Sequence, residues 1–324
     1  MEHGRPPLAS CLDTDILTYL SLKGAAMGKK GKKAQAGKPK KLTPKDVGKR
    51  INTLAKIVEE ELEGADLFAP LPPTDDCAIC LVPLSRVVSN SGHWACCGNI
   101  ICVACINENE ESIKKQNEEK SAGKKLALTC PFCREPRPSS DGYIRQLQAR
   151  FLQNDHAAFT AMGDLYREGH YLDYGLPRDD LKALDYYIRA VEHGSAPACT
   201  GIGKSYREGN GVAVDMERAA LFERIGALRG DVCARHNIGN FEYKSGNHEV
   251  GIRHWKIAAE GGSQPSIDML KKVYNNADGT IPGKEFISKE EMDTVYRSGH
   301  DAQMEIKTEE REKHCTRHKH DMKC

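Results

Sequence analysis

The stretch CCGNIICVAC, residues 96–105, decides how the central part of the chain folds, because it places four cysteines within ten residues. Cys102 and Cys105 are separated by two residues, and the same gap recurs on either side, in Cys77 with Cys80 and in Cys130 with Cys133. A two-residue gap lets two thiolates converge on one tetrahedral metal ion, and four thiolates complete its coordination. We therefore predict two closed structural zinc sites, with no open position for metal catalysis and no other cofactor.

The other cysteines are scattered: Cys11, Cys199, Cys233, Cys315 and Cys324. The chain lacks the basic start and apolar core of a secretory signal, so a reducing compartment is expected. In such a compartment clustered cysteine pairs bind metal, and a disulfide scaffold is the weaker alternative. Cys199 and Cys233 fall at apolar helical positions, which predicts that both side chains are buried.

The length of the chain allows two or more domains, and its composition does not indicate binding to nucleic acid or to a membrane. The chain has 324 residues and a net charge of +1, which gives no overall attraction to nucleic acid or to membranes. No apolar run reaches the roughly 18 residues that a membrane span requires. We expect a cytoplasmic protein, with the nucleus as the alternative location.

The N-terminal residues 1–42 are predicted to be a disordered, lysine-rich tail. Residues 28–41 carry seven lysines and no acid. A solvated tail is the preferred interpretation of this cluster, and a nuclear-localisation or nucleic-acid contact is the alternative. Met27 is a candidate internal start.

A helix is predicted over residues 43–64, with Thr43 as its N-cap and Pro44 at its first position. Its apolar residues recur at helical spacing: Val47, Ile51, Leu54, Val58 and Leu62. Residues 65–76 contain three prolines and are predicted to be a linker into the cysteine-rich segment.

From about residue 155 the chain becomes self-similar. The first motif is MGDLYREG (162–169), IGKSYREG (202–209) and IGNFEYKSG (238–246); the second is KALDYYIRAVEHG (182–194), RAALFERIGALRG (218–230) and VGIRHWKIAAEGG (250–262). The glycines Gly163, Gly203 and Gly239 are 40 and 36 residues apart. Two helical segments per unit at this period predict a solenoid of αα-hairpins, for which three units are about the minimum.

Small and aromatic residues are predicted to form the core of this solenoid. Small residues let the helices approach closely: Gly163, Gly203, Gly239, Ala183, Ala190, Ala219 and Ala258. Aromatic residues fill the layers between them: Tyr166, Tyr187, Tyr206, Phe222 and Trp255. Helical patterns continue over residues 266–275, and residues 283–324 are predicted to form a charged helix, capped by Ser288 and running to about Lys313, and a tail. A metal site at His314, Cys315, His318, His320 and Cys324 is a weak alternative to a simple solvated tail.

The cysteine pattern resembles that of a RING finger. The carrying motifs are Cys-x2-Cys at residues 77–80, Cys-Gly-x3-Cys-x2-Cys at residues 97–105 and Cys-Pro-x-Cys at residues 130–133. The resemblance implies a small zinc-stabilised α+β cross-brace domain over residues 77–138. In a cross-brace, Cys77, Cys80, Cys102 and Cys105 hold one ion, while Cys130 and Cys133 hold the other with two ligands from residues 93–97.

The identity of those two ligands stays open. Most RING fingers have a histidine two residues after the third cysteine, whereas this chain has Asn99, a poor zinc ligand. Cys96 and Cys97 are the preferred pair, and Gly98 would permit the turn that lets both reach one ion. His93 with Cys97 is the alternative, and His93 as an ordinary polar loop residue is the plain interpretation.

The helical units resemble Sel1-like repeats, which are relatives of tetratricopeptide repeats. Leu-Gly or its equivalent followed by tyrosine, and Lys-Ala followed by an aromatic residue, alanine and glycine, are recognisable and weakest in the third copy. The resemblance implies an all-α solenoid over residues 150–275, in units of about 155–198, 199–234 and 235–270.

The RING resemblance implies a ubiquitin ligase, which binds a ubiquitin-charged conjugating enzyme and positions the thioester without covalent chemistry. It places the conjugating-enzyme contact at Ile79 and Pro131, and matches Arg134 to the arginine that often bridges the enzyme and ubiquitin. One departure is Asn109, where many ligases carry a large apolar side chain. The leading hypothesis is a ligase whose repeats recruit a protein substrate or scaffold. The rival is a non-enzymatic zinc-binding adaptor.

Overall fold

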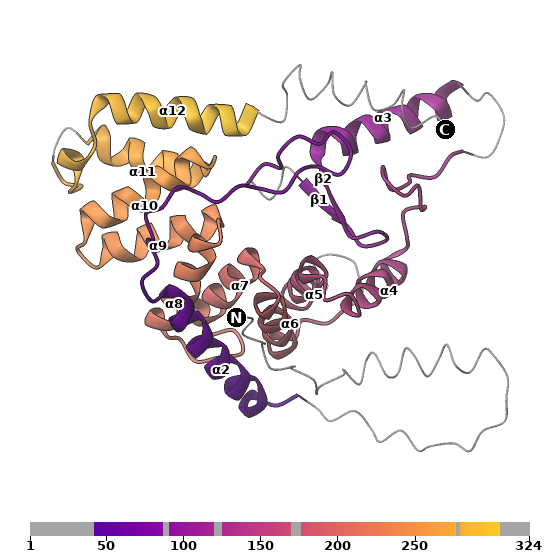
Figure 1. Cartoon of the computed structure of the whole chain (residues 1–324), viewed down its shortest axis with the longest axis horizontal. Helices are drawn as coiled ribbons and strands as arrows, with labels where there is room; N and C mark the ends of the chain where they lie inside the picture. Colours follow the sequence, from indigo (N-terminus) through magenta and orange to yellow (C-terminus); the bar gives the residue numbers. More distant parts are fainter. Residues whose placement is uncertain (1–41, 87–90, 120–124, 170–175, 277–278, 305–324) are drawn as a thin grey trace, which may run out of the picture. The chain divides into compact units, whose positions relative to one another are not determined.

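Helices dominate the part of the chain that the computed structural model describes, which is residues 42–86, 91–119, 125–169, 176–276 and 279–304. The described residues from Pro44 onward form one compact unit. This unit contains a small cysteine module and a stack of helices (Figure 1). No helix in the described ranges is both long and apolar enough to cross a membrane. The lysine cluster and the C-terminal histidines and cysteines lie outside the described residues.

Helix α2, Pro44–Leu62, confirms the helix expected over residues 43–64. Its buried stripe is the predicted one, with Ala55 added and Leu62 only half-buried: Val47, Ile51, Leu54, Ala55 and Val58. The stripe packs against two helices of the repeats, α6 and α8. Charged pairs border this contact, since Glu61 on α2 accepts two hydrogen bonds from Arg229 at 3.1 and 2.7 Å.

The repeats form three αα-hairpins of equal helices. They pair α5 (His156–Glu168) with α6 (Asp180–Glu192), α7 (Ala196–Glu208) with α8 (Met216–Leu228), and α9 (Val232–Lys244) with α10 (His248–Glu260); α11 (Gln264–Tyr274) follows. Each paired helix has 13 residues, and five of the six begin at an Asp or Ser whose side chain accepts backbone N–H groups. The expected limits at 198/199 and 234/235 fall inside α7 and α9, so the helix pairs set the better boundaries.

The predicted glycines lie where the two helices of each hairpin touch. A Cβ at Gly163 would lie 2.6 Å from the Tyr187 ring, and one at Gly239 would lie 2.4 Å from Trp255. The helices can therefore approach only because these residues lack a side chain. The same position in the second repeat faces the buried carboxylate Glu223, which pairs with Arg207 and accepts a hydrogen bond from Asn237 at 3.1 Å. All five predicted aromatic side chains are buried.

Successive first helices of the hairpins are joined by one recurring side-chain contact. Thr160 hydrogen-bonds Ser195 at 2.9 Å, and Thr200 donates to Asp231 at 2.7 Å. In each case a hydroxyl near the start of one helix meets the N-cap residue of the next first helix. At the same place in the third repeat, His236 lies 2.8 Å from the Ser266 hydroxyl, which is inside α11 and not at its N-cap. The repeats are therefore linked by polar bonds as well as by apolar packing.

The cysteine module contains one hairpin and one helix. Strand β1 (Ser91–Trp94) pairs antiparallel with β2 (Asn99–Cys102), and α3 (Val103–Glu119) follows directly. Two isolated bridges, Asp76 with Pro83 and Thr129 with Pro136, close the loops that carry the outer cysteine pairs. Helix α3 carries many charged residues, and most of its side chains are exposed or half-buried.

Two stretches differ from expectation. No helix is predicted between residues 138 and 150, yet α4 spans Ser140–Phe151, with Ser139 as its N-cap. Its buried residues Leu147 and Phe151 are one turn apart, and Phe151 stacks on Phe159 of α5 at 4.6 Å. In addition, Cys233 is exposed, whereas Cys199 is fully buried as predicted. Position 233 faces away from the neighbouring helices, which its apolar surroundings in the sequence do not reveal.

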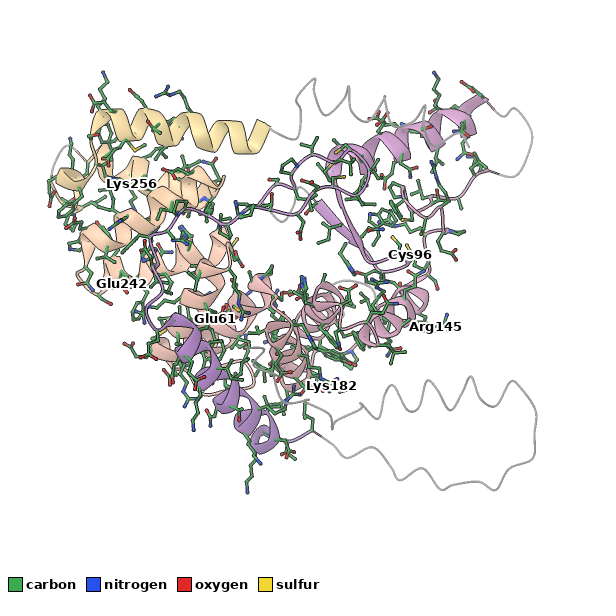
Figure 2. The ribbon with its side chains drawn as sticks, viewed as in Figure 1. Glu61, Cys96, Arg145, Lys182, Glu242 and Lys256 are labelled. Atoms are coloured by element: carbon green, nitrogen blue, oxygen red, sulfur yellow. The ribbon has the colours of Figure 1, made fainter. Side chains whose placement is uncertain are left out.

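The C-terminal helix closes the stack. Ser288 caps α12 (Lys289–Met304) as predicted, because its hydroxyl accepts the N–H of Glu291 at 3.1 Å while the Glu291 carboxylate accepts the N–H of Ser288. Val295 and Met292 of α12 are buried in one cluster with Trp255 of α10. Lys256 (Figure 2) reaches the Glu291 carboxylate at 2.6 Å and the Phe286 carbonyl at 2.8 Å. The expected continuation to Lys313 lies outside the described residues.

Residues 65–73, called the strap below, are more than the expected linker. The strap has no regular secondary structure, yet Arg235, which is 1% exposed, donates to the Leu67 carbonyl at 2.5 Å. Phe68 lies between His254, at 4.8 Å between ring centroids, and the Arg253 guanidinium at 3.9 Å. The strap therefore binds along the third repeat.

Candidate metal centres

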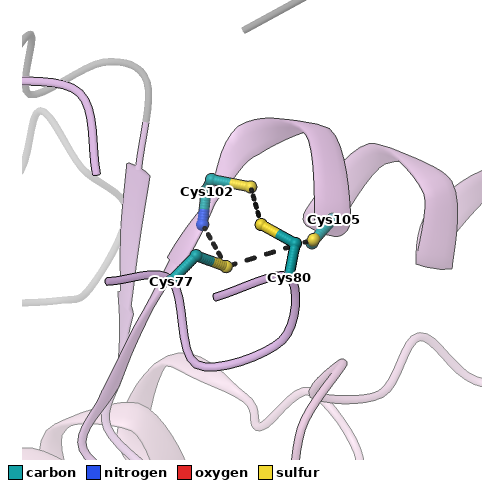
Figure 3. A group of neighbouring side chains, drawn as sticks. All are labelled: Cys77, Cys80, Cys102 and Cys105. Atoms are coloured by element: carbon teal, nitrogen blue, oxygen red, sulfur yellow. Dashed lines mark hydrogen bonds between the residues drawn. The ribbon is translucent and has the colours of Figure 1, made fainter. Parts of the chain in front are cut away.

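The first cysteine cluster joins three elements of the module (Figure 3). Cys77 and Cys80 lie on the turn before β1, Cys102 ends β2, and Cys105 lies in the first turn of α3. The Sγ atoms of Cys77 and Cys105 are 4.0 Å apart, and those of Cys80 and Cys102 are 3.8 Å apart. All four side chains are buried, so this cluster forms the centre of the module.

The second cluster joins the hairpin turn to the last loop. Cys96 and Cys97 follow β1, while Cys130 and Cys133 lie on the loop after α3. The Sγ atoms of Cys97 and Cys130 are 3.8 Å apart, and those of Cys96 and Cys133 are 3.4 Å apart. Gly98 has φ 77°, in the left-handed region, which provides the turn needed for adjacent cysteines to face one point.

Both clusters fit a tetrahedral metal ion such as zinc. Thiolates bound about 2.3 Å from one ion in tetrahedral geometry lie about 3.8 Å apart, close to the four Sγ separations above. All the cysteines of the module are free thiols, and within each cluster the Sγ atoms lie within 4.8 Å of one another. Zinc bound at both would be structural, since four thiolates leave no site for a substrate.

The two outer loops share a local backbone geometry that points their thiols inward. Leu81 N–H donates to the Cys77 carbonyl at 2.9 Å, and Arg134 N–H donates to the Cys130 carbonyl at 3.0 Å. Leu81 and Arg134 each follow the second cysteine of the pair, and both have positive φ, 57° and 63°. The two loops therefore make the same tight turn, although one lies before β1 and the other after α3.

The clusters have the crossed order that the sequence resemblance implies: the first and third cysteine pairs form one, the second and fourth the other. His93 belongs to neither cluster. Its Nε2 lies 3.2 Å from Asp155 Oδ2, at the start of α5. The geometry therefore favours Cys96 with Cys97 over the alternative with His93, and metal binding by these residues stays a prediction.

The electrostatics of four crowded thiols favour a divalent cation. The pKa of Cys77 is lowered, chiefly by hydrogen bonds with Cys102 and then Cys105 and Cys80. The pKa of Cys96 is raised, first by burial and then by its hydrogen bonds with Cys133 and Cys130. Each cluster thus favours one thiolate and resists further ionisation. A bound cation would compensate the remaining negative charge, and its binding would release protons.

The predicted partner-binding residues differ in exposure. Ile79 is half-buried against the module core, Pro131 is buried, and Arg134 is exposed. Pro131 therefore presents little surface to a partner. The neighbouring apolar residues Leu81 and Phe132 are 60% and 46% exposed, and sequence reasoning missed them. Their place beside a paired cysteine was the available signal, because the cysteines turn inward and leave such neighbours outside.

Asn109, the departure noted in the sequence, has a structural role. Its side-chain amide donates to the Thr129 carbonyl at 3.0 Å, just before the last cysteine loop. Further along α3, Asn117 exchanges two hydrogen bonds with the backbone of Leu126, at 3.0 and 2.6 Å. These asparagines hold the chain that returns from α3 against the helix, which positions Cys130 and Cys133.

No protein-family model matches the chain, and no curated protein matches it. Among solved structures, a Sel1 repeat protein from Oxalobacter formigenes is 28% identical over 52% of this chain and 66% of its own, with a TM-score of 0.43. A protective antigen of uropathogenic Escherichia coli with an SLR fold is 24% identical over 49% of this chain and 33% of its own, with a TM-score of 0.39. An immunity protein from Pseudomonas aeruginosa is 15% identical over 61% of this chain and 83% of its own, with a TM-score of 0.31. The match spans less than two thirds of each of the first two proteins.

Proposed function

We propose that the chain is a RING-type ubiquitin ligase whose cysteine module binds a ubiquitin-charged conjugating enzyme and whose repeats recruit a protein substrate or scaffold. The observation that carries the proposal is the crossed order of the two cysteine clusters around one hairpin and one helix. Two metal ions would hold the outer loops side by side without a large apolar core. Such a module contributes no reacting group and acts by positioning a bound thioester.

The contact surface proposed for the conjugating enzyme is apolar with one cation beside it. It comprises Ile79 and Leu81 on the first cysteine loop and Phe132 on the last. Arg134 follows directly and is exposed, so its planar guanidinium is available to bridge the enzyme and ubiquitin through paired hydrogen bonds. Asn109, which donates to the Thr129 carbonyl, occupies the helix position at which many RING ligases have a large apolar side chain. We therefore expect modest affinity for conjugating enzymes.

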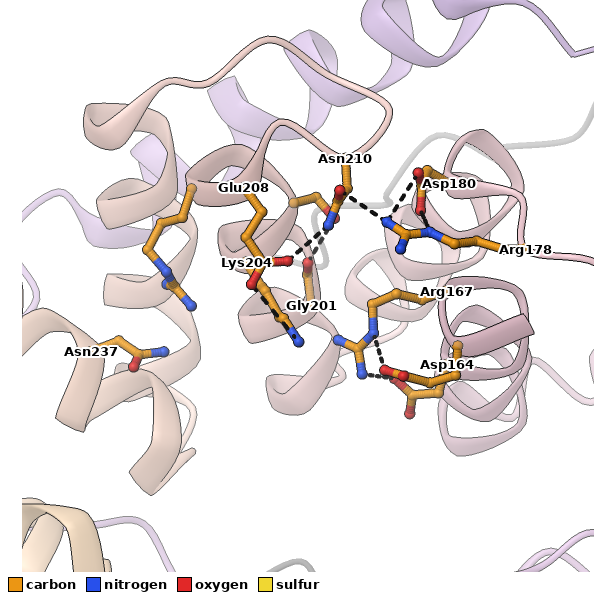
Figure 4. A network of polar contacts seen from close by, with 12 residues as sticks. Asp164, Arg167, Arg178, Asp180, Gly201, Lys204, Glu208, Asn210 and Asn237 are labelled. Atoms are coloured by element: carbon orange, nitrogen blue, oxygen red, sulfur yellow. Dashed lines mark hydrogen bonds and ion pairs between the residues drawn. The ribbon is translucent and has the colours of Figure 1, made fainter. Parts of the chain in front are cut away.

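The repeats present a polar surface for a second partner. Helix α2 packs against α6 and α8, the second helices of their hairpins. The first helices carry charged side chains in mixed pairs (Figure 4), such as Arg167 with Asp164 at 3.1 Å. Arg178, in the loop before α6, reaches Asn210 at 3.0 Å and so connects two repeats. A surface of alternating charges fits a polar protein segment better than an apolar one.

A ubiquitin-chain assay with a panel of conjugating enzymes tests the proposal. Ile79→Ala, Leu81→Ala and Arg134→Ala should each reduce chain formation strongly. Leu152→Ala is the matched control, because Leu152 is 58% exposed, close to the 60% of Leu81, but lies at the end of α4. It should leave chain formation unchanged. If the zinc-loaded protein forms no chains with any enzyme of the panel, the module is the non-enzymatic adaptor instead.

A further inference from the structure

The cysteine module is inserted between two parts of the chain that both bind the helix stack. On its N-terminal side, α2 packs on α6 and α8, and the strap contacts Arg235, Arg253 and His254. On its C-terminal side, α4 packs on α5. Three residues separate the strap from Cys77, and six separate Cys133 from the start of α4, which leaves little free linker to absorb relative motion.

A three-residue polar cluster joins the hairpin of the module to the start of the repeats. Asp155 Oδ2 lies 3.2 Å from His93 Nε2 of β1 and 2.9 Å from Arg150 Nε of α4. The side chains of His93, Asp155 and Arg150 are 13%, 11% and 19% exposed. These contacts are therefore shielded from solvent, which makes each stronger than the same contact on the open surface.

The two carboxylate oxygens of Asp155 have different partners, one at the start of α5 and the other in the module and α4. Oδ1 caps α5 by accepting the N–H groups of Ala157 and Ala158, at 3.1 and 3.2 Å. Oδ2 is left for His93 and Arg150. Burial alone would raise the pKa of this carboxyl, but hydrogen bonds with His93 and then Arg150 hold the pKa below its usual value. The carboxylate therefore stays charged in the folded protein at neutral pH.

Arg150 also contacts the hairpin directly. A Cβ at Gly98 would lie 1.7 Å from an Arg150 nitrogen, so the guanidinium occupies the space beside this glycine. Gly98 directly follows Cys97 of the second cluster. A second contact between module and stack lies elsewhere, where Arg86 donates to the Pro72 carbonyl of the strap next to Gly230 of the second repeat.

Between these contacts a pocket of about 270 Å³ separates the module from α5. Ala78, Leu84 and Ile100 line it from the module, and His156 and Ala157 line it from the repeats. The junction is thus held at its polar contacts rather than by a continuous apolar interface. Loss of the polar contacts should therefore loosen the module without exposing a large core.

We propose that Asp155 is a positioning residue that locks the cysteine module onto the helix stack, so that the two move as one rigid body. If the chain is the proposed ligase, a rigid body restricts which lysines of the chain itself come near the bound thioester. Only this consequence rests on the proposed function. The lock itself depends on the geometry of three residues and requires no ligase activity. A module on a free linker would instead sample many orientations relative to the repeats.

Asp155→Asn tests the lock, because asparagine still caps a helix but carries no charge for His93 and Arg150. Asp231→Asn is the matched control: Asp231 caps α9 in the same way, through Cys233 and Ala234, but its second oxygen binds Thr200 within the repeats. In the zinc-loaded full chain, Asp155→Asn should raise amide hydrogen exchange in β1, β2 and α4 by roughly tenfold or more. Asp231→Asn should change exchange only around α9.

A double-mutant cycle shows whether the effect passes through the contact. His93→Ala should raise exchange in the same segments, and the double variant should show little more than either single change. Additive effects would mean that His93 and Asp155 act separately. Unchanged exchange in Asp155→Asn, with two zinc ions still bound, overturns the lock.

Activity assays separate this inference from the proposed function. If the chain is a ligase, Asp155→Asn should leave discharge of the charged conjugating enzyme onto free lysine unchanged, while ubiquitin should attach to additional lysines of the chain itself, mapped by mass spectrometry. An unchanged set of modified lysines would overturn the effect on site choice. If no variant shows ligase activity, the proposed function fails, and the exchange measurements still decide whether the lock exists.

Discussion

The buried cluster of the cysteine module contains five cysteines and two aliphatic side chains, Leu84 and Ile101. The cluster at the C-terminal end of the stack contains no cysteine and is built from side chains such as Trp255, Leu270 and Val295. One region thus has a core of thiols that could hold a metal, and the other is built by apolar burial. The lesson is that the two regions should fail under different conditions, although they belong to one compact unit. The chain has two tryptophans, Trp94 in β1 and Trp255 in α10, so each region has its own fluorescent reporter.

The largest expected difference comes from removing one thiolate. Cys77→Ser should abolish metal binding at the first cluster and unfold the module, because structural zinc supplies on the order of 10 kcal/mol in small domains. Zinc per chain should fall to one or less, and Trp94 fluorescence should change while Trp255 fluorescence does not. Cys199→Ser is the control: this cysteine is also fully buried but lies in the stack, where serine could still donate to the Ser195 carbonyl. It should retain two zinc ions. Equal loss of both reporters in Cys77→Ser would contradict the comparison.

Acid should affect the two regions through different groups. In the stack, burial and then the nearby Arg235 charge lower the pKa of His254 to about 4 from 6.5. Above pH 6.5 the neutral form dominates in both folded and unfolded states, so His254 adds no pH dependence there. Between pH 6.5 and 4 the unfolded state binds a proton that the folded state does not. The free energy of unfolding therefore decreases as the pH is lowered, by about 2 kcal/mol from pH 7 to pH 5.

Unfolding by urea, followed by Trp255 fluorescence in a Trp94→Phe background, measures this loss. His254→Phe keeps an aromatic ring next to Phe68 and should remove about 2 kcal/mol of the pH dependence. The same pH dependence in both proteins would assign the acid sensitivity of the stack to other groups.

The stability of the stack should depend on close packing between its helices, which the module lacks. Gly239→Ala would place a methyl group 2.4 Å from Trp255 and should lower the free energy of unfolding by about 1–3 kcal/mol. Gly48→Ala is the control, since Gly48 also lies in a helix but has nothing within 4 Å of a new Cβ. It should be stabilising by up to about 1 kcal/mol. Urea unfolding with Trp255 as reporter measures both, and a neutral Gly239→Ala would show that the helices can separate without cost.

How much of this was predictable follows from how local each signal is. The cysteine pairs and the repeat motifs are local patterns, so the cysteine pairs, α2 and the helical hairpins could be anticipated from spacing, while the grouping of the pairs into two clusters was implied by the resemblance to RING fingers. The strap was not, because Phe68 and Leu67 find Arg253 and Arg235 more than 160 residues away. His93 looked like a candidate ligand because histidine often binds zinc, but its contact is Asp155, 62 residues later in the chain. Such contacts depend on how the folded helices and strands pack together, and the periodic pattern of apolar residues in the sequence carries no information about that packing.

The smallest expected effect is a difference between the two cysteine clusters of the module in how fast they lose metal. All four thiols of the first cluster are buried, whereas Cys133 of the second is exposed and Cys96 and Cys97 are half-buried. A chelator can reach an exposed thiolate and assist its dissociation, so the second cluster should lose metal about tenfold faster than the first. Release of zinc into a coloured chelator should then show two phases of equal amplitude. Cys133→Ser should remove the fast phase and leave the slow one. A single phase in the unmodified protein would mean that the lock and the shared loops make the two centres open together.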